Sequence, residues 1–174
     1  RLLRSSRTTV RTWVITGWVG GTVVSGSPEA ISRLQLSSLH YYQRPDVAYV
    51  DFDPSATSLK GWAGRIFVNK QKGSFVFNTA LGAMSPGFHA VDLGYHTRGD
   101  IINGHVEVGY QSYHPGKTFR TWKVTFATLR SYDFGGVRTN ENYILSATAQ
   151  LLNYWRGNLY LSYDPNRTSH YLTR

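Results

Sequence analysis

Residues 101–113 read IINGHVEVGYQSY, and their side chains alternate between apolar and polar at every second position. The apolar set consists of Ile102, Gly104, Val106, Val108 and Tyr110. The alternate set consists of Asn103, His105, Glu107, Gly109 and Gln111. Successive side chains of a β-strand point to opposite faces. The period of two therefore predicts a long strand with one apolar face and one wet face.

Six further segments are rich in Val, Ile, Thr, Tyr, Phe and Trp, as strands are. They lie near residues 10–23, 58–70, 74–84, 118–132, 141–152 and 157–163. Most reach the ~9–11 residues that a tilted strand needs to cross a bilayer, whereas strands of soluble proteins more often have ~5–6. We therefore expect an all-β fold, an antiparallel meander of about seven or eight long strands. It would form part or all of an outer-membrane-type up-and-down β-barrel.

The connections between these segments alternate in length. Short ones fall at 71–73, 114–117 and 153–156, a medium one at 133–140, and long ones at 24–57 and 85–100. Outer-membrane barrels have short periplasmic turns and longer external loops. The pattern predicts a single partial barrel over residues 1–174, with 24–57 as a long external loop. In that loop, Ser27-Pro28-Glu29 supplies an N-cap, a first-turn proline and an acidic first turn, which predicts a short helix near 28–39.

The alternation in the two central strands assigns side chains to opposite faces. The lipid-facing candidates are Ile102, Val106, Val108, Trp122, Val124 and Phe126. The candidates for a polar lumen are Asn103, His105, Glu107 and Lys123. A soluble antiparallel sheet with one solvated face has the same alternation, so this alternative stays open. Burial of the row Trp122, Val124 and Phe126 in a compact core would exclude the barrel.

Composition restricts the class of protein and its partners. The 174 residues contain no cysteine and carry a formal charge of +9, which excludes a disulfide scaffold and permits an anionic partner. The basic residues are scattered, whereas a nucleic-acid reader concentrates them on a stripe. We therefore expect membrane lipid or lipopolysaccharide as the partner, glycans as a further candidate, and no nucleic acid. No run of apolar residues is long enough for a transmembrane helix.

Motifs for catalysis, metals and cofactors are weak. The sequence lacks GxSxG, HExxH and phosphate-binding glycine motifs, so we predict no catalytic residue, no metal site, no cofactor and a protein that is not an enzyme. His89, Asp92 and His96 form the most crowded titratable group, interpreted as a solvated external loop. A second loop carries candidate ligand-binding residues that could stack on and hydrogen-bond a sugar, or simply pack the loop over a barrel mouth. They are Tyr41, Tyr42, Arg44 and Asp46.

Several stretches taken in order resemble one bacterial protein family. They are Leu36 to Asp46, Ser58 to Gly64, Ser85 to Phe88, Asp92 to Tyr95, and Asn153-Tyr154-Trp155. They resemble the C-terminal domain of a family of unknown function whose members carry an N-terminal family-9-type carbohydrate-binding module. The resemblance implies that this domain is an outer-membrane β-barrel and that the present chain is an internal fragment of it. It supplies no catalytic residues.

The sequence is compatible with two main functions. The first is a non-catalytic segment of a barrel in the bacterial outer membrane, which anchors a carbohydrate-binding module or passes small polar solutes or glycans. The resemblance suggests the anchoring role, and the polar lumen suggests the passage role. The alternative is a soluble antiparallel β-protein that binds carbohydrate through aromatic loops.

Overall fold

A computed structural model describes residues 12–91 and 98–168, which contain seven strands and one helix. In chain order these are β1 (Trp13–Ser25), α1 (Pro28–Leu36), β2 (Ser58–Lys70), β3 (Phe75–Met84), β4 (Ile101–Ser112), β5 (Phe119–Tyr132), β6 (Arg138–Leu151) and β7 (Arg156–Arg167). The prediction of an all-β fold with long strands is confirmed.

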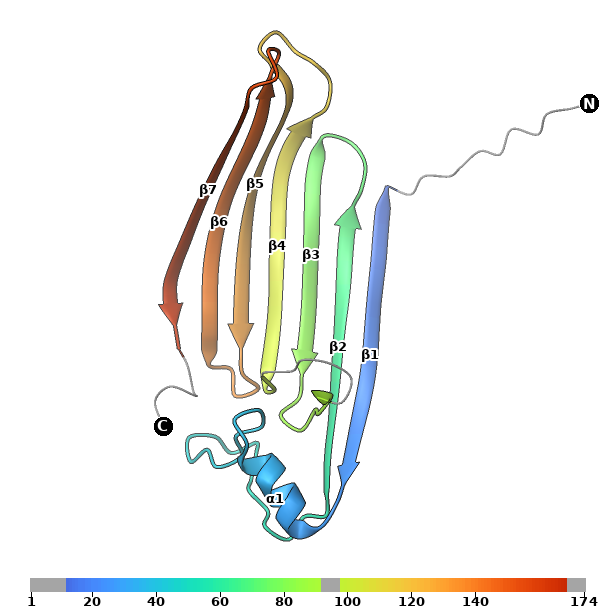
Figure 1. The fold of residues 1–174 in the computed structure, drawn as a ribbon, viewed down its shortest axis with the longest axis vertical. Helices are drawn as coiled ribbons and strands as arrows, with labels where there is room; N and C mark the ends of the chain where they lie inside the picture. Colours follow the sequence, from blue (N-terminus) through green and yellow to red (C-terminus); the bar gives the residue numbers. More distant parts are fainter. Residues whose placement is uncertain (1–11, 92–97, 169–174) are drawn as a thin grey trace, which may run out of the picture.

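All seven strands form one antiparallel sheet in the order β1-β2-β3-β4-β5-β6-β7, so each strand pairs with its neighbours in sequence (Figure 1). The meander topology is therefore confirmed. The sheet is open, because no pairing joins β1 to β7 within the described residues. The described chain thus forms a meander of the expected kind without closing it.

Some predicted boundaries were wrong by a few residues. β6 begins at Arg138 rather than 141, and β7 extends to Arg167 rather than 163. Both extensions are polar, so they lack the apolar alternation that marked the strand centres, and ladder pairing rather than side-chain pattern holds them. The helix ends at Leu36, before the predicted 39. The strand expected at 10–23 runs from Trp13 to Ser25, and residues 10 and 11 lie outside the described residues.

The meander places the connections in two groups at opposite ends of the sheet (Figure 1). The described residues of the three longer connections, 26–57, 85–91 with 98–100, and 133–137, lie at one end, here called the long-loop end. Segments 71–74, 113–118 and 152–155 lie at the other, the short-turn end. Every odd-numbered strand therefore runs toward the long-loop end.

The helix α1 is fixed at its start by a local cap and along its length by one buried amide. Ser27 is the N-cap and its side chain accepts a hydrogen bond from the Ala30 amide, while Pro28 occupies the first turn. The Gln35 side chain donates to the Asp53 carbonyl and accepts from the Asp53 amide, both at 2.9 Å. This two-way bond attaches the later part of segment 26–57 to the helix. No helix in the described residues is long and apolar enough to cross a membrane.

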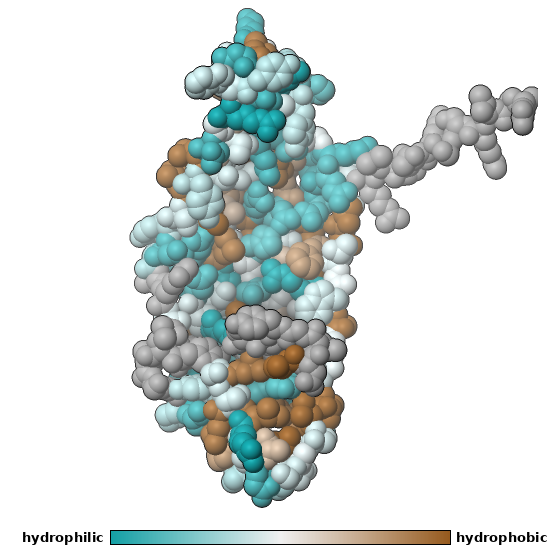
Figure 2. Space-filling model, viewed as in Figure 1, coloured by the Kyte–Doolittle hydropathy of each residue, from teal (hydrophilic) through white to brown (hydrophobic). Residues whose placement is uncertain are grey.

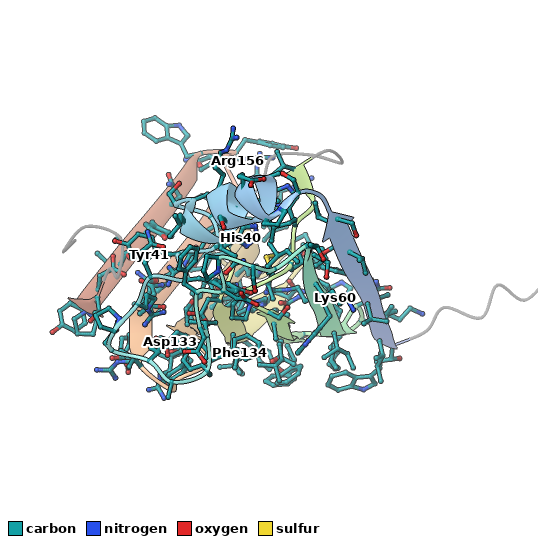
Figure 3. The ribbon with its side chains drawn as sticks, turned by 90° about the horizontal axis from the view of Figure 1, so that it is seen from below. His40, Tyr41, Lys60, Asp133, Phe134 and Arg156 are labelled. Atoms are coloured by element: carbon teal, nitrogen blue, oxygen red, sulfur yellow. The ribbon has the colours of Figure 1, made fainter. Side chains whose placement is uncertain are left out.

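Seen from the long-loop end, the strands form an arc with β1 and β7 at its two ends, and α1 lies inside the arc with His40 (Figure 3). The sheet therefore has a concave face, which holds α1 and the loops, and a convex face. Buried apolar side chains are few among the described residues. They are Ile31, Leu39, Val50, Leu59, Ala63, Ala80 and Phe88. This small core lies where α1 and the loops meet β2 and β3 on the concave side.

Gly61 of β2 allows the turn at Gly87 and Phe88 to pack against the sheet. A Cβ atom at Gly61 would lie 2.0 Å from the Phe88 amide nitrogen, which no packed structure accommodates. At Gly20 of the neighbouring strand β1, a Cβ atom would meet nothing within 4 Å.

Gly61→Ala is therefore expected to displace the Phe88 turn and lower the free energy of unfolding by roughly 1–3 kcal/mol, the usual cost of overpacking. Gly20→Ala, the matched control, should leave stability within about 0.5 kcal/mol of the original. Denaturant titration of both variants under the same conditions measures the difference. Equal stability of the two variants would contradict the packing described here.

Candidate functional site

The convex face carries the apolar side chains and leaves them exposed. Val106 is 42% exposed and Phe126 is 45% exposed, although both lie in the middle of paired strands. The register continues this face across the sheet, because Phe126 pairs with Val108 on one side and Leu145 on the other. The exposed members of the face include Ile15, Val19, Ile66, Leu81, Val106, Val108, Val124, Phe126, Leu145, Leu159 and Leu161. No compact core covers them in the described residues.

All six predicted lipid-facing residues lie on this convex face. Val106, Val108, Val124 and Phe126 are exposed, and Ile102 and Trp122 are partly exposed. Their placement on one face follows from the pairing of β4 with β5. Contact with lipid is not tested by this placement and stays a prediction.

Charged residues on the convex face lie near strand ends, where the register places Lys60, Lys70, Arg130, Arg138 and Glu141. Between these ends the face carries apolar, glycine and threonine positions. The result is an uncharged band that crosses all seven strands. A face solvated by water on its own has no reason to exclude charge in this way.

Aromatic side chains gather at both borders of the uncharged band. At the short-turn end, Tyr110 stacks on Trp122 with ring centroids 6.2 Å apart, and Trp13 meets Phe77 edge-on at 5.7 Å. At the long-loop end, Trp62 meets Phe134 edge-on at 6.0 Å. Two aromatic borders around an apolar band are the pattern of membrane-interface girdles.

The concave face carries polar side chains that are hydrogen-bonded to one another, together with apolar residues of the first strands such as Trp18 and Phe67. Arg65 donates a hydrogen bond of 2.6 Å to the Asn103 side chain. His105 contacts Asn78, which in turn bonds Asn69. Figure 2, which looks toward this face, shows hydrophilic residues along the middle of the sheet and hydrophobic residues at its sides.

The four predicted lumen residues all lie on the concave face. Glu107 and Lys123 form an ion pair at 3.6 Å, and Asn103 and His105 bond partners from β2 and β3. Sequence analysis missed the partners Arg65, Asn69 and Asn78. In the first three strands, apolar residues such as Phe67 and Val76 lie on the concave face while others such as Ile66 lie on the convex face, so alternation gave no signal there.

A buried ion cluster ties the three loops together at the long-loop end. The Arg44 guanidinium donates to Asp100 at 2.6 Å, Asp133 at 3.1 Å and Asp46 at 3.2 Å. Asp100 also accepts a hydrogen bond of 2.7 Å from the Tyr49 hydroxyl. Arg44, Asp100 and Asp133 are 6%, 5% and 1% exposed. One cation from segment 26–57 therefore links carboxylates of the other two loops.

Backbone amides share the excess negative charge of this cluster. The Phe134 amide donates to Asp100 at 3.1 Å, and the Val137 amide donates to Asp133 at 2.8 Å. Burial disfavours the charged guanidinium, but the hydrogen bonds to Asp46 and Asp133 outweigh it and raise the pKa of Arg44. Burial and the hydrogen bond to Asp100 raise the pKa of the Tyr49 hydroxyl. The charged arginine and the neutral tyrosine are thus the stable forms.

The predicted loop-ligand residues divide between this cluster and a pocket. Arg44 and Asp46 belong to the cluster, so their charged groups are engaged by protein partners. Tyr42 lines a pocket of about 410 Å³ together with Tyr49, Lys60, Trp62 and Ser85. Tyr41 is not among the residues that line it. Figure 3 shows Tyr41, Lys60, Asp133 and Phe134 at different points around this end of the molecule.

A second polar contact joins segment 26–57 to the next loop. Buried His40 places Nδ1 2.7 Å from the Pro86 carbonyl oxygen and Nε2 3.0 Å from Nδ1 of His89. When a neutral His40 donates from Nδ1, its Nε2 accepts a hydrogen bond from His89. Asp92 and His96, predicted to crowd this loop, lie outside the described residues. The described residues hold no group of three or more His, Asp or Glu side chains able to bind a metal ion.

Comparison with known proteins identifies the family of this chain. A family model described as Domain of unknown function (DUF5916) matches residues 32–174. The chain belongs to this family. The matched region of DUF5916 contains β2 to β7, the Arg44 cluster and the polar concave face. Its description assigns no reaction, and comparisons with curated proteins and with solved structures found no match.

Arg44→Gln is expected to lower the free energy of unfolding by about 3–5 kcal/mol, because it leaves buried Asp100 and Asp133 without their counter-charge. Denaturant titration measures this loss, and proteolysis of segment 26–57 should accelerate. Arg33→Gln on exposed α1 removes the same charge outside the cluster and should change stability by less than about 0.5 kcal/mol. Equal losses of stability in the two variants would contradict the role of Arg44 in linking the loops.

Tyr49→Phe should lower stability at neutral pH and matter less in alkali. The folded chain holds the Tyr49 pKa above its ordinary value of 10.0, so the contribution of the neutral hydroxyl is fully present below pH 10. It is lost as the pH rises from there through the folded pKa. Melting temperatures of both proteins between pH 7 and 11 test this. A difference that stays constant up to pH 11 would contradict it.

Proposed function

We propose that the chain is a non-catalytic segment of a β-barrel in the bacterial outer membrane. The observation that carries the proposal is the inverted arrangement of side chains. The uncharged apolar band is exposed on the convex face, and the hydrogen-bonded polar network occupies the concave face. A bilayer in contact with the convex face would remove the apolar side chains from water, at about 25 cal/mol for each Å² covered.

Strand length and loop placement support the same proposal. The strands have 10 to 14 residues, enough for a tilted crossing of a bilayer. The longer connections gather at one end and the short turns at the other, which matches external loops and periplasmic turns. In this orientation the Arg44 cluster and α1 lie at the external mouth.

The open edges impose a further requirement on a membrane location. Unpaired N–H and C=O groups of β1 and β7 cannot remain exposed to hydrocarbon. We propose that strands outside residues 12–168 pair with these edges and complete a barrel. Its lumen would be lined by the network around Arg65, Asn103 and His105.

Within the membrane, the barrel segment would anchor a carbohydrate-binding module or pass small polar solutes or glycans. The family resemblance supports the module, and the polar concave face supports passage. Membrane lipid or lipopolysaccharide would cover the convex face.

The alternative is a soluble protein that binds carbohydrate at its loops. The specific observation in its favour is the pocket lined by Tyr42, Tyr49, Lys60 and Trp62, which combines aromatic rings with polar groups. The soluble alternative does not explain what covers the exposed apolar residues of the convex face, so we rank it second. A chain that stays monomeric in water without detergent and never enters vesicles would favour it.

Two adjacent residues of β6 test the membrane proposal. Leu145 lies on the convex face and is 38% exposed, whereas Ser146 pairs with Thr125 on the concave face. In the full-length protein, with the strands that pair with β1 and β7, Leu145→Arg should cost about 2–4 kcal/mol in a bilayer and reduce insertion into phospholipid vesicles, measured by flotation and resistance to carbonate extraction. Ser146→Arg adds the same charge to the polar face and should insert like the original chain.

Unimpaired insertion of Leu145→Arg, together with impaired insertion of Ser146→Arg, would reverse the assignment of the two faces. Failure of the full-length protein, with the strands that pair with β1 and β7, to enter vesicles would reject the membrane proposal itself.

A further inference from the structure

We propose that the convex rim at the long-loop end binds a phosphate group of lipopolysaccharide, with part of an acyl chain in the groove beside it. The site consists of Arg130, Arg138 and Glu141, and the groove surrounds Gly104. The inference rests on the proposed membrane location and names the lipid that the rim recognises.

Glu141 holds the two arginines side by side. Its Oε1 accepts from Arg130 at 3.2 Å and its Oε2 accepts from Arg138 at 2.7 Å. Oε1 also accepts a hydrogen bond of 2.7 Å from the Tyr143 hydroxyl. Because both carboxylate oxygens are engaged, Glu141 orients two guanidinium groups at one place on the surface.

The charge and exposure of this cluster suit an anion. Two guanidinium groups meet one carboxylate at this point of the rim. The Glu141 side chain is only 6% exposed, whereas those of Arg130 and Arg138 are 50% and 39% exposed. The cation donors therefore face outward and the carboxylate does not. Guanidinium groups bind phosphate oxygens by paired, charge-assisted hydrogen bonds.

An apolar groove begins at the same cluster. It has a volume of about 410 Å³, and Arg130 and Tyr132 line it together with Leu81, Ile102 and Val106. Gly104 contributes no side chain to it, and a Cβ atom there would come within 2.9 Å of the Ala80 carbonyl oxygen. The groove thus joins a cationic group to an apolar surface within the uncharged band. This combination fits a molecule that carries a phosphate directly above acyl chains.

Position decides between lipopolysaccharide and an ordinary phospholipid. The cluster lies at the long-loop end, which faces the cell exterior in the proposed orientation. The outer leaflet there is built from lipopolysaccharide, whose lipid A carries phosphate groups over several acyl chains. Phospholipids belong to the opposite leaflet, near the short-turn end. We therefore commit to lipopolysaccharide.

The test measures binding of fluorescent lipopolysaccharide to the full chain in neutral detergent. Arg130→Gln/Arg138→Gln should weaken binding at least about tenfold, which corresponds to about 1.4 kcal/mol. Lys70→Gln/Lys72→Gln, the matched control at the short-turn end, removes the same charge and should leave the affinity unchanged. Lipopolysaccharide without its lipid A phosphates should bind the original chain as weakly as intact lipopolysaccharide binds the double arginine variant.

A separate variant tests whether an acyl chain binds in the groove. Val106→Phe narrows it without changing charge and should weaken lipopolysaccharide binding while both arginines remain. Unchanged affinity of this variant would overturn the placement of the acyl chain.

Other outcomes would overturn the phosphate site. They are unchanged affinity of the double arginine variant, equal binding of the dephosphorylated lipid, an equal loss in the lysine control, and equally effective competition by phosphatidylglycerol. The dephosphorylated lipid tests the site on the original chain, so a folding defect in a variant cannot decide the result. Vesicle flotation of the unsubstituted full-length protein separates the two proposals. A chain that inserts but fails these binding tests refutes the lipid site alone.

Discussion

The register of the antiparallel ladder is the constraint on which the rest of this molecule depends. Pairing such as Val108 with Phe126 and Phe126 with Leu145 places apolar residues of successive strands on the same face. A shift of one residue between any two strands would exchange the faces of every strand beyond it. Register therefore decides at once which surface is apolar and which surface can hold the Arg65–Asn103 contact.

The Arg44 cluster solves a separate problem, because the loops at the long-loop end have no ladder of their own to fix them. A small apolar core under α1 supplies part of the stabilisation, and the guanidinium supplies connections among three loops. Asp100 adopts a positive φ of 52° in this cluster, a conformation that aspartate tolerates better than bulkier residues. Its carboxylate thereby receives Arg44, Tyr49 and the Phe134 amide together. The Arg44 cluster fixes the loops at the long-loop end, and the ladder of paired strands fixes which side chains lie on each face of the sheet.

The sequence predicted the faces of strands whose side chains alternate, but it could not predict contacts between residues that are far apart in the chain. The alternation in 101–113 and the adjacent segment 118–132 was sufficient to place Val106, Val124 and Glu107 on their observed faces. In 58–70 apolar residues occur on both parities, so Arg65 could not be assigned. Arg44 was identified as a loop residue, but its partners Asp100 and Asp133 lie 56 and 89 residues away in sequence. No local pattern encodes contacts at that separation, and the same limit applies to the pairing of His40 with His89.

The convex face and the open edges lead to one physical conclusion when they are considered together. In water, the edges of β1 and β7 would be hydrated, but the apolar band across seven strands would have no cover. In hydrocarbon, the band would be covered, but each unpaired N–H and C=O of the edges would cost several kcal/mol. Neither solvent satisfies the described sheet alone. In the arrangement that we propose, a bilayer would satisfy both surfaces once added strands paired the edges, and the concave network would become an enclosed interior that keeps Arg65, Glu107 and Lys123 away from lipid. Arrangements in water must instead supply a protein surface that covers the whole convex face.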